Sequence, residues 1–136
     1  MGNAKPFRFT LDTNSGVPVY RQLIDQVLLA MASGALESGS QLPTVRQLAV
    51  DLSINPNTVV RAYKELEIRG ILATQQGTGT FLTHKKVKQD ETLRRRRLTQ
   101  MVSGFLSQAG GEGFSLDEIH EILKDWMREK DTGGKQ

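Results

Sequence analysis

Two short amphipathic patterns, separated by only Ser53 and Ile54, constrain the fold of this chain more than any other feature. The first pattern begins at Thr44 and ends near Leu52, and the second begins at Asn55 and ends at Gly70. Such a tight joint between two short helices is typical of the helix-turn-helix motif, whose second helix enters a DNA major groove. The sequence therefore predicts two packed helices with a joint too short for any other element.

The ends of both helices carry recognisable signals. Thr44 and Gln47 have the spacing of a capping box, in which each side chain pairs with the other residue's backbone N–H. Asn55 is a strong N-cap, Pro56 fits the first helical position, and Gly70 is a good terminator. The apolar stripes that should face a core are Val45, Leu48, Ala49 and Leu52 on the first helix and Val59, Ala62, Tyr63 and Leu66 on the second.

The second helix has a polar face near its start. At 100° per residue, Asn57, Arg61 and Lys64 fall within about 60° of one another. Arg matches guanine, Asn matches adenine, and Lys or Thr can bind a base or a phosphate, so we expect Arg61 to read a base and Lys64 to meet phosphate. Asn55 and Thr58 lie at the positive end of the helix dipole, which suits phosphate, although capping is the main role expected of Asn55.

Other residues near this face can be assigned by charge and position. Thr44, at the start of the first helix, is a candidate DNA contact, whereas for Arg46 beside it the residues alone favour a surface ion pair with a neighbour such as Asp51. Glu65 and Glu67 would repel the DNA backbone, so we expect the last two turns of the second helix to leave the groove.

A hairpin should follow directly. Residues 71–76 and 80–83 read as strands around Gly77, Thr78 and Gly79, whose glycines permit the positive φ of a tight turn. We expect this hairpin to be a wing, with Gln76 to Gly79 at its tip touching DNA, and the alternative is an ordinary turn. A glycine-rich nucleotide loop is disfavoured because no helix follows. A brief strand is expected at 40–42.

Two elements should precede the motif. Residues 7–11 alternate Phe7, Phe9 and Leu11 with polar residues, which predicts a short strand or, as the alternative, a flexible arm. The course of the arm 1–17 stays open. A helix is expected over 18–33, because apolar residues recur at helical spacing and Gly34 is a good stop, the stripe being Tyr20, Leu23, Ile24, Val27 and Met31.

After His84 the composition becomes strongly charged, and two further helices are expected, separated by a glycine-rich break at 109–113. Their apolar stripes would leave a large exposed patch unless something covered them, so we expect a dimer interface. The expected interface residues are Leu98, Met101, Val102, Phe105, Ile119, Leu123 and Trp126. Arg94 to Arg97 point almost all the way around a helix, which favours a solvated collar over a nucleic-acid patch.

Several classes of function find no support in the composition. The chain has no cysteine, and its two histidines, His84 and His120, lack ligand spacing, so neither a metal site nor a cofactor is expected. No apolar run approaches the ~18 residues of a membrane helix, and no secretory signal is visible, which favours a cytoplasmic protein. The net charge of +3 favours a polyanionic partner only weakly.

The segments LPTVRQLA, NPNTVVRAYKELE and GTGTF, at their spacing here, resemble the DNA-binding domain of the GntR family of bacterial transcription regulators. The resemblance covers residues 18–83 and implies a DNA contact at Arg46. The short helical remainder is similar to that of the YtrA-like branch, whose tail serves dimerisation. Other branches often have Arg where this chain has Pro56, so no base contact is assigned to Pro56.

The expected fold is mainly α with a small β-hairpin: a winged helix-turn-helix domain over 1–84, with its core at 18–83, and a two-helix dimerisation region over 85–136. The expected function is a homodimeric transcription regulator on a palindromic operator in double-stranded DNA, with repression as the expected direction of regulation. The main alternative is an architectural DNA-binding protein. An enzyme is not expected, because the sequence shows no nucleophile–base pair. An unknown small-molecule effector stays open.

Overall fold

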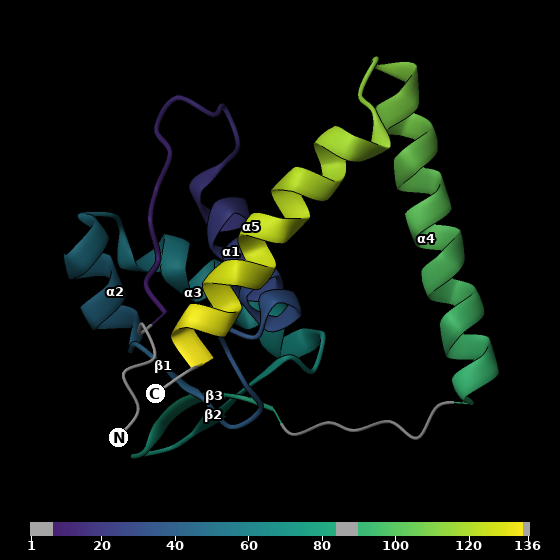
Figure 1. Ribbon diagram of the computed structural model, residues 1–136. Coiled ribbons are helices and arrows are strands. Elements are labelled where there is room, and N and C mark those ends of the chain that lie inside the picture. The colour runs from purple at the N-terminus through teal and green to yellow at the C-terminus, as the bar shows by residue number, and fades with distance from the viewer. Residues whose placement is uncertain (1–6, 84–89, 135–136) are drawn as a thin grey trace. The chain divides into compact units, whose positions relative to one another are not determined.

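A computed structural model of the protein describes residues 7–83 and 90–134, which divide into two compact units (Figure 1). The elements of the first unit are α1 (Val19–Ser33), β1 (Gln41–Leu42), α2 (Val45–Leu52), α3 (Pro56–Ile68), β2 (Leu72–Gln75) and β3 (Gly79–Leu82). The second unit contains α4 (Glu91–Gly111) and α5 (Leu116–Gly134) as far as Thr132. The expected fold class, a small winged helix-turn-helix domain with two further helices, is confirmed.

The core of the first unit lies where α1 and α2 pack against α3. Its most deeply buried large side chains are Leu23, Ile24, Val27, Val59 and Leu66. The stripes expected for all three helices face this core, with one correction on α1. Met31 is exposed by 40%, and Ala30 is buried in its place. The sequence prediction considered only large apolar side chains and so omitted the small Ala30, which lies on the buried face.

The strands form one antiparallel sheet in the order β1-β3-β2. The hairpin pairs Leu72 with Leu82 and Gln75 with Gly79, and the brief strand expected near 40–42 is the two-residue β1. Gly77 has φ +81° and Gly79 has φ +137°, so the turn uses the conformational freedom expected of these two glycines.

The strand expected over residues 7–11 is wrong. The segment forms no strand, although Phe9 is buried in the core. Its backbone bonds to side chains of α1: the Thr10 N–H donates to Gln26 Oε1 at 2.8 Å, and Gln26 Nε2 donates to the Thr10 carbonyl at 2.7 Å. Gln22 makes the same pair of bonds with Asp12 at 2.9 and 3.1 Å. Glutamine amides of α1 therefore supply the pairing that a neighbouring strand would supply.

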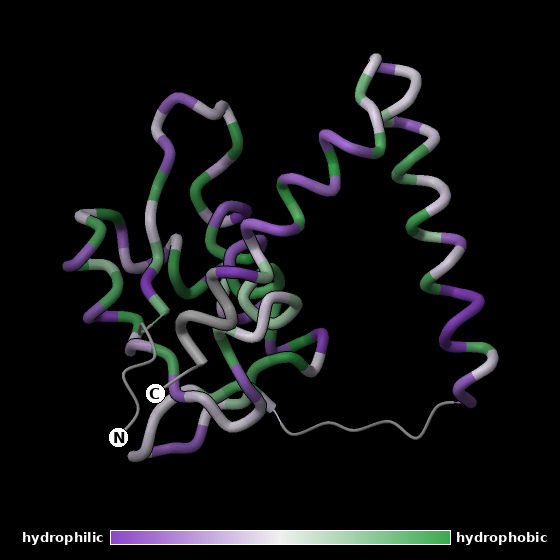
Figure 2. Tube along the Cα trace, in the orientation of Figure 1, coloured by the Kyte–Doolittle hydropathy of each residue, from purple (hydrophilic) through white to green (hydrophobic). Residues whose placement is uncertain are grey.

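The second unit consists of two long helices joined by a short turn at Glu112–Ser115. Asp90 caps α4 by accepting from the Thr92 N–H at 2.8 Å, and the Ser115 hydroxyl accepts from the Glu118 N–H at 3.2 Å. Hydrophobic and hydrophilic residues alternate along both helices (Figure 2). Among the described side chains of this unit, Ala109 is the only apolar one that is buried, so both helices leave their apolar faces open.

Candidate DNA interface

The position of α3 is set by its cap and its buried face. Asn55 Oδ1 accepts from the Asn57 N–H at 2.8 Å, and Pro56 occupies the first turn, as expected. On the opposite side Val59, Ala62 and Leu66 have no exposed surface. Because that face is held by α1 and α2, the polar face of α3 is directed away from the core.

The polar face carries the residues that the sequence assigned to DNA. Asn57, Arg61 and Lys64 are all exposed, as is Asn55, and Thr58 is half-buried. Glu65 forms an ion pair with Arg69, with 2.6 Å between Oε2 and Nη2. That pair lies in the last turns of α3, so it neutralises a carboxylate that would repel a phosphate.

The N-terminus of α2 is also ordered by its cap. The Gln47 N–H donates to Thr44 Oγ1 at 3.0 Å, and the Thr44 N–H donates to Gln47 Oε1 at 3.1 Å, so the expected capping box is confirmed. The Thr44 hydroxyl accepts in this box and keeps its own proton free to donate. Arg46 is exposed, and in the described part of the chain it forms no ion pair with Asp51.

Tyr63 ties α3 to the segment in front of α2. Its side chain is 4% exposed, and its hydroxyl donates to the Pro43 carbonyl at 2.7 Å. Burial raises the pKa of the Tyr63 phenol well above its ordinary value, so the hydroxyl stays a donor. The bond fixes the start of α2 relative to α3, because Pro43 immediately precedes the Thr44 cap.

The wing is held from two sides by residues that sequence reasoning missed. Gln41 of β1 donates from Nε2 to the Thr78 carbonyl at 3.1 Å, and a Cβ on Gly79 would come within 2.5 Å of that nitrogen. The Thr74 hydroxyl donates to Glu67 Oε2 at 2.8 Å, which joins β2 to α3. At the tip, Gln76, Gly77 and Thr78 are exposed and Gly79 is half-buried.

Tyr20 of α1 lies against the polar face of α3. The Arg61 guanidinium carbon is 3.7 Å from the centroid of the Tyr20 ring, and that of Arg21 is 5.9 Å away. A side-chain hydrogen bond with Tyr20 raises the pKa of Arg21 above its ordinary value. The sequence placed Tyr20 in the apolar stripe, and its half-buried position at the end of that stripe brings it to Arg61.

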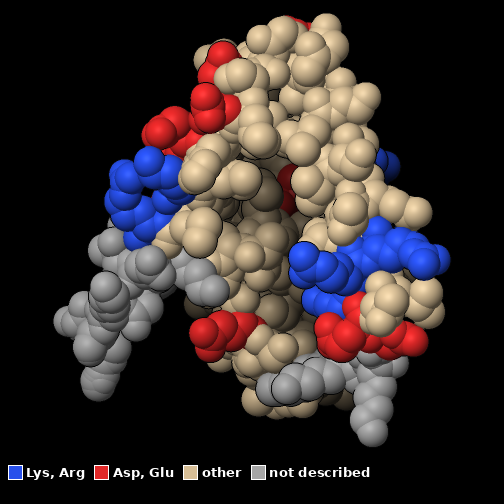
Figure 3. Space-filling model, turned by 45° about the vertical axis from the view of Figure 1, so that its right-hand side comes forward, with Lys and Arg blue, Asp and Glu red and all other residues tan. Residues whose placement is uncertain are grey.

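Charged side chains of both signs lie near one another elsewhere on the surface (Figure 3). Basic side chains gather in separate groups, with acidic ones beside them, on the side of the molecule that Figure 3 shows. Arg95, Arg96 and Arg97 follow Asp90 and Glu91 along α4 and are exposed. Among the described residues, no group of three or more metal-ligating side chains comes together, and no helix is long and apolar enough to cross a membrane.

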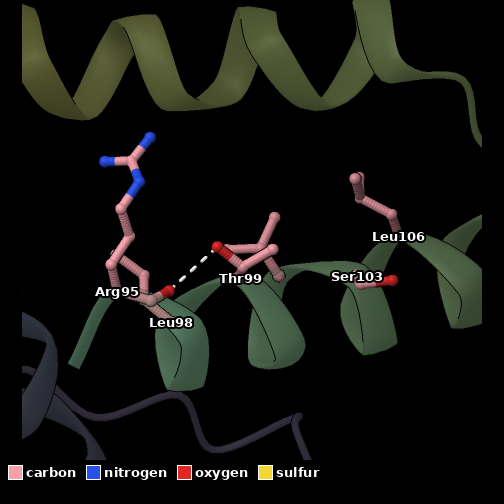
Figure 4. A pocket seen from close by; sticks show the side chains of 6 residues that line it. Arg95, Leu98, Thr99, Ser103 and Leu106 are labelled. Carbon is pink, nitrogen blue, oxygen red and sulfur yellow. Dashed lines mark hydrogen bonds between the residues drawn. The ribbon is translucent and has the colours of Figure 1, made fainter. Parts of the chain in front are cut away.

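A shallow hollow runs along α4 (Figure 4). All the residues that line it come from this one helix, and the Thr99 hydroxyl donates to the Arg95 carbonyl at 2.9 Å beside it. The hollow is therefore an open helix face and not an enclosed cavity. Its lining residues are Arg95, Leu98, Thr99, Val102, Ser103 and Leu106, of which Leu98 and Val102 belong to the expected dimer interface.

Three helices around one core, with an exposed polar face on the third and a hairpin after it, define a winged helix-turn-helix protein of the DNA-binding class. The family described as "Bacterial regulatory proteins, gntR family" matches residues 19–82. Together with the relatives below, this match shows that the chain belongs to the GntR family and resembles its YtrA-like members. The protein is a DNA-binding transcription regulator.

The relatives match most of the chain. The "HTH-type transcriptional repressor YtrA" of Bacillus subtilis is 35% identical over 130 residues, covering 93% of this chain and 96% of the relative. A GntR family regulator from Listeria monocytogenes has a similar structure, with TM-score 0.57, 33% identity, and 82% and 97% of the two chains covered. For YtrA from Sulfolobus acidocaldarius the TM-score is 0.53, with 29% identity and 73% and 97% coverage.

Proposed function

We propose that the protein is a homodimeric transcription repressor that recognises a palindromic operator. Residues 1–84 form its DNA-binding domain, and residues 85–136 form its dimerisation region. Repression is the direction of regulation assigned because the similar Bacillus subtilis protein is described as a repressor. Such a regulator works where the bacterial chromosome is, in the cytoplasm.

One observation carries the assignment of DNA recognition to α3. Asn57, Arg61 and Lys64 are exposed on a helix whose opposite face is completely buried. A helix fixed on one side and polar on the other is what major-groove reading requires, because the reading residues must not be needed by the core. Arg61 would bind a guanine edge, Asn57 an adenine edge, and Lys64 a phosphate.

The remaining contacts would position the domain on the duplex. The free proton of the Thr44 hydroxyl and the Arg46 guanidinium suit phosphate oxygens, as do the N-terminal amides of α3 next to Asn55 and Thr58. The wing tip would follow the backbone or enter a minor groove. Its proposed contact residues are Gln76, Gly77, Thr78 and Gly79, of which Gly77 is the most accessible to a phosphate because it is exposed and has no side chain.

Dimerisation is proposed for the second unit because its apolar side chains are exposed. Phe105 is exposed by 56%, Leu123 by 55% and Trp126 by 40%, on helices whose own unit does not cover them. Apolar surface of this extent is typical of an interaction site. The proposed interface residues are Leu98, Met101, Val102, Phe105, Ile119, Leu123 and Trp126. A two-fold dimer places two reading helices on two half-sites, which implies operator palindromy.

The test is selection of bound duplexes from a random pool by the purified protein. A repressor of this kind should enrich a palindrome, and a duplex with one half-site scrambled should bind at least tenfold more weakly. Enrichment of bent or A·T-rich DNA without a palindrome would instead indicate an architectural DNA-binding protein. Repeating the selection with candidate small molecules would reveal an effector as a loss of enrichment.

A further inference from the structure

Tyr20 brings an aromatic ring to the residue assigned to base reading. Arg61 is exposed on α3, yet its guanidinium carbon lies 3.7 Å from the Tyr20 ring centroid. This distance is well inside the ~6 Å within which a cation is attracted to a ring face. Tyr20 itself is half-buried, and Leu23 and Ile24, one turn further along α1, are fixed in the core. The ring is therefore a firm surface for a flexible side chain.

The two carboxylates of α3, those of Glu65 and Glu67, are engaged with other residues. Glu65 lies four residues after Arg61 on the same helix, a spacing that favours an ion pair, but it pairs with Arg69 at 2.6 Å. Glu67 accepts a hydrogen bond from Thr74 at 2.8 Å. Among the described residues, the interaction recorded for the Arg61 guanidinium is its contact with the Tyr20 ring.

An aromatic partner has a consequence that a carboxylate partner would not have. A carboxylate would occupy two of the five N–H donors of Arg61, and those donors lie in the plane of the guanidinium. A ring face contacts the guanidinium from above, so it limits the orientation of the plane and leaves the edge donors available. A base edge needs those same in-plane donors for a bidentate contact with guanine.

We propose that Tyr20 is a positioning residue for base recognition: its ring orders the Arg61 guanidinium before DNA arrives and so strengthens binding to the preferred sequence. This inference rests on the proposed function, in which Arg61 reads a base. Ordering the side chain in the free protein removes part of the entropy cost that a mobile arginine would incur on binding. Tyr20 need not touch DNA to have this effect.

The DNA-free protein offers a direct test of the contact. Protons held over a ring face are shifted upfield, so the Arg61 Nε–Hε resonance should lie upfield of the other arginine resonances in an NMR spectrum. Tyr20→Phe, which keeps the ring, should preserve the shift, and Tyr20→Leu should abolish it. An Arg61 resonance that is the same in the native protein and in Tyr20→Leu would overturn the proposal.

The binding test uses the duplex that the native protein enriches from a random pool and a scrambled duplex of equal composition. Tyr20→Leu should weaken binding to the enriched duplex about two- to fivefold, which is the range expected for one exposed cation–π contact. Its affinity for the scrambled duplex should equal that of the native protein. Tyr20→Phe should bind like the native protein. In an Arg61→Ala background, Tyr20→Leu should have no further effect.

Each other outcome counts against the proposal. Equal loss on both duplexes, or equal loss with and without Arg61, would mean that Tyr20 acts through the fold. Tighter binding by Tyr20→Leu would mean that the ring sequesters Arg61. If Tyr20→Leu does not fold, Tyr20→Met replaces it, since methionine keeps a long apolar side chain without a ring face. Failure to enrich any duplex overturns the proposed function, whereas enrichment with additive effects of Tyr20 and Arg61 overturns this inference alone.

Discussion

The two units of the molecule use the same kind of helix in opposite ways. In residues 7–83, the apolar stripes of α1, α2 and α3 face one another and are buried. In residues 90–128, large apolar side chains on α4 and α5 remain exposed, with Leu98 at 60% and Met101 at 64%. An amphipathic pattern therefore predicts that a helix needs an apolar partner, but not whether the same chain supplies it.

Because the apolar side chains are buried in the first unit and exposed in the second, mutations in the two units should change different properties of the protein. A side chain buried within the first unit contributes to the free energy of unfolding wherever the protein is studied. An apolar side chain on the second unit contributes once another surface covers it, which we propose is a second copy of the chain. Substitutions in the two units should thus affect different measurements.

The largest effect is expected in the core of the first unit. Leu66 has no exposed surface, so Leu66→Ala should lower the free energy of unfolding by about 2–5 kcal/mol through lost burial and a residual cavity. Urea denaturation followed by circular dichroism measures this. Ile68→Ala is the matched control, because Ile68 lies on the same helix with 77% exposure and should change stability by less than about 0.5 kcal/mol. Similar losses for both variants would contradict the described packing of α3.

The second effect should appear in self-association. Trp126 is exposed by 40% within its own unit, and burial of a tryptophan at a dimer centre contributes about 2 kcal/mol or more. Trp126→Ala should therefore raise the dimer dissociation constant about 30-fold or more, measured by sedimentation equilibrium. Lys124→Ala, which removes an exposed pair with Glu121, should leave association almost unchanged. A dimer that is insensitive to Trp126 would place the interface elsewhere.

Features that depend on neighbouring residues were predictable from the sequence. The Thr44–Gln47 capping box, the Asn55 cap and the Gly77 turn each arise within four residues of chain, and all three are present. The buried stripes of α2 and α3 follow from helical spacing in the same way. This is why the helix-turn-helix, the hairpin and the exposed polar face of α3 could be predicted from the order of the residues.

Contacts between distant residues were not predictable. The bond from Gln41 to Thr78 joins residues 37 positions apart, and the stacking of Arg61 on Tyr20 depends on how α1 crosses α3. Neither residue type signals its partner: glutamine is ordinary on a surface, and tyrosine suits the apolar stripe. The supports of the candidate site, in contrast to its reading residues, therefore depend on the three-dimensional arrangement of the elements.

A third effect, on DNA binding, should leave self-association unchanged, because Arg61 and Lys64 lie outside α4 and α5. The free energy of unfolding should fall by no more than about 1 kcal/mol, which is the contribution of an exposed cation–π contact such as that of Arg61 with Tyr20. Arg61→Ala should weaken binding to the preferred duplex by about 1–3 kcal/mol and relax its base preference. Lys64→Ala should weaken binding to all duplexes similarly and reduce the salt dependence by about one ion. Titrations by fluorescence anisotropy at several salt concentrations distinguish them. Uniform weakening by Arg61→Ala would reassign Arg61 to a phosphate.

The arm in front of α1 shows how a correct pattern can lead to a wrong element. Its alternation does bury Phe9, as a strand face would. However, Thr10 and Asp12, two residues apart in an extended segment, pair with Gln26 and Gln22, which are four residues apart on a helix. Two extended residues span about 6.6 Å and four helical residues about 6 Å, so the two repeats match closely.

The smallest effect should come from breaking this match. Gln26→Ala removes both hydrogen bonds to Thr10 and should cost about 1 kcal/mol of unfolding free energy, since the pair is exposed and water can replace it. Gln26→Glu should keep one of the two hydrogen bonds and lose the other, because an ionised carboxylate can accept from the Thr10 N–H but cannot donate to the Thr10 carbonyl. Protonation restores the donor, so Gln26→Glu should approach native stability as the pH falls below the ordinary glutamate pKa of about 4.3, whereas Gln26→Ala should not. Parallel pH curves for the two variants would show that the amide does not substitute for a strand.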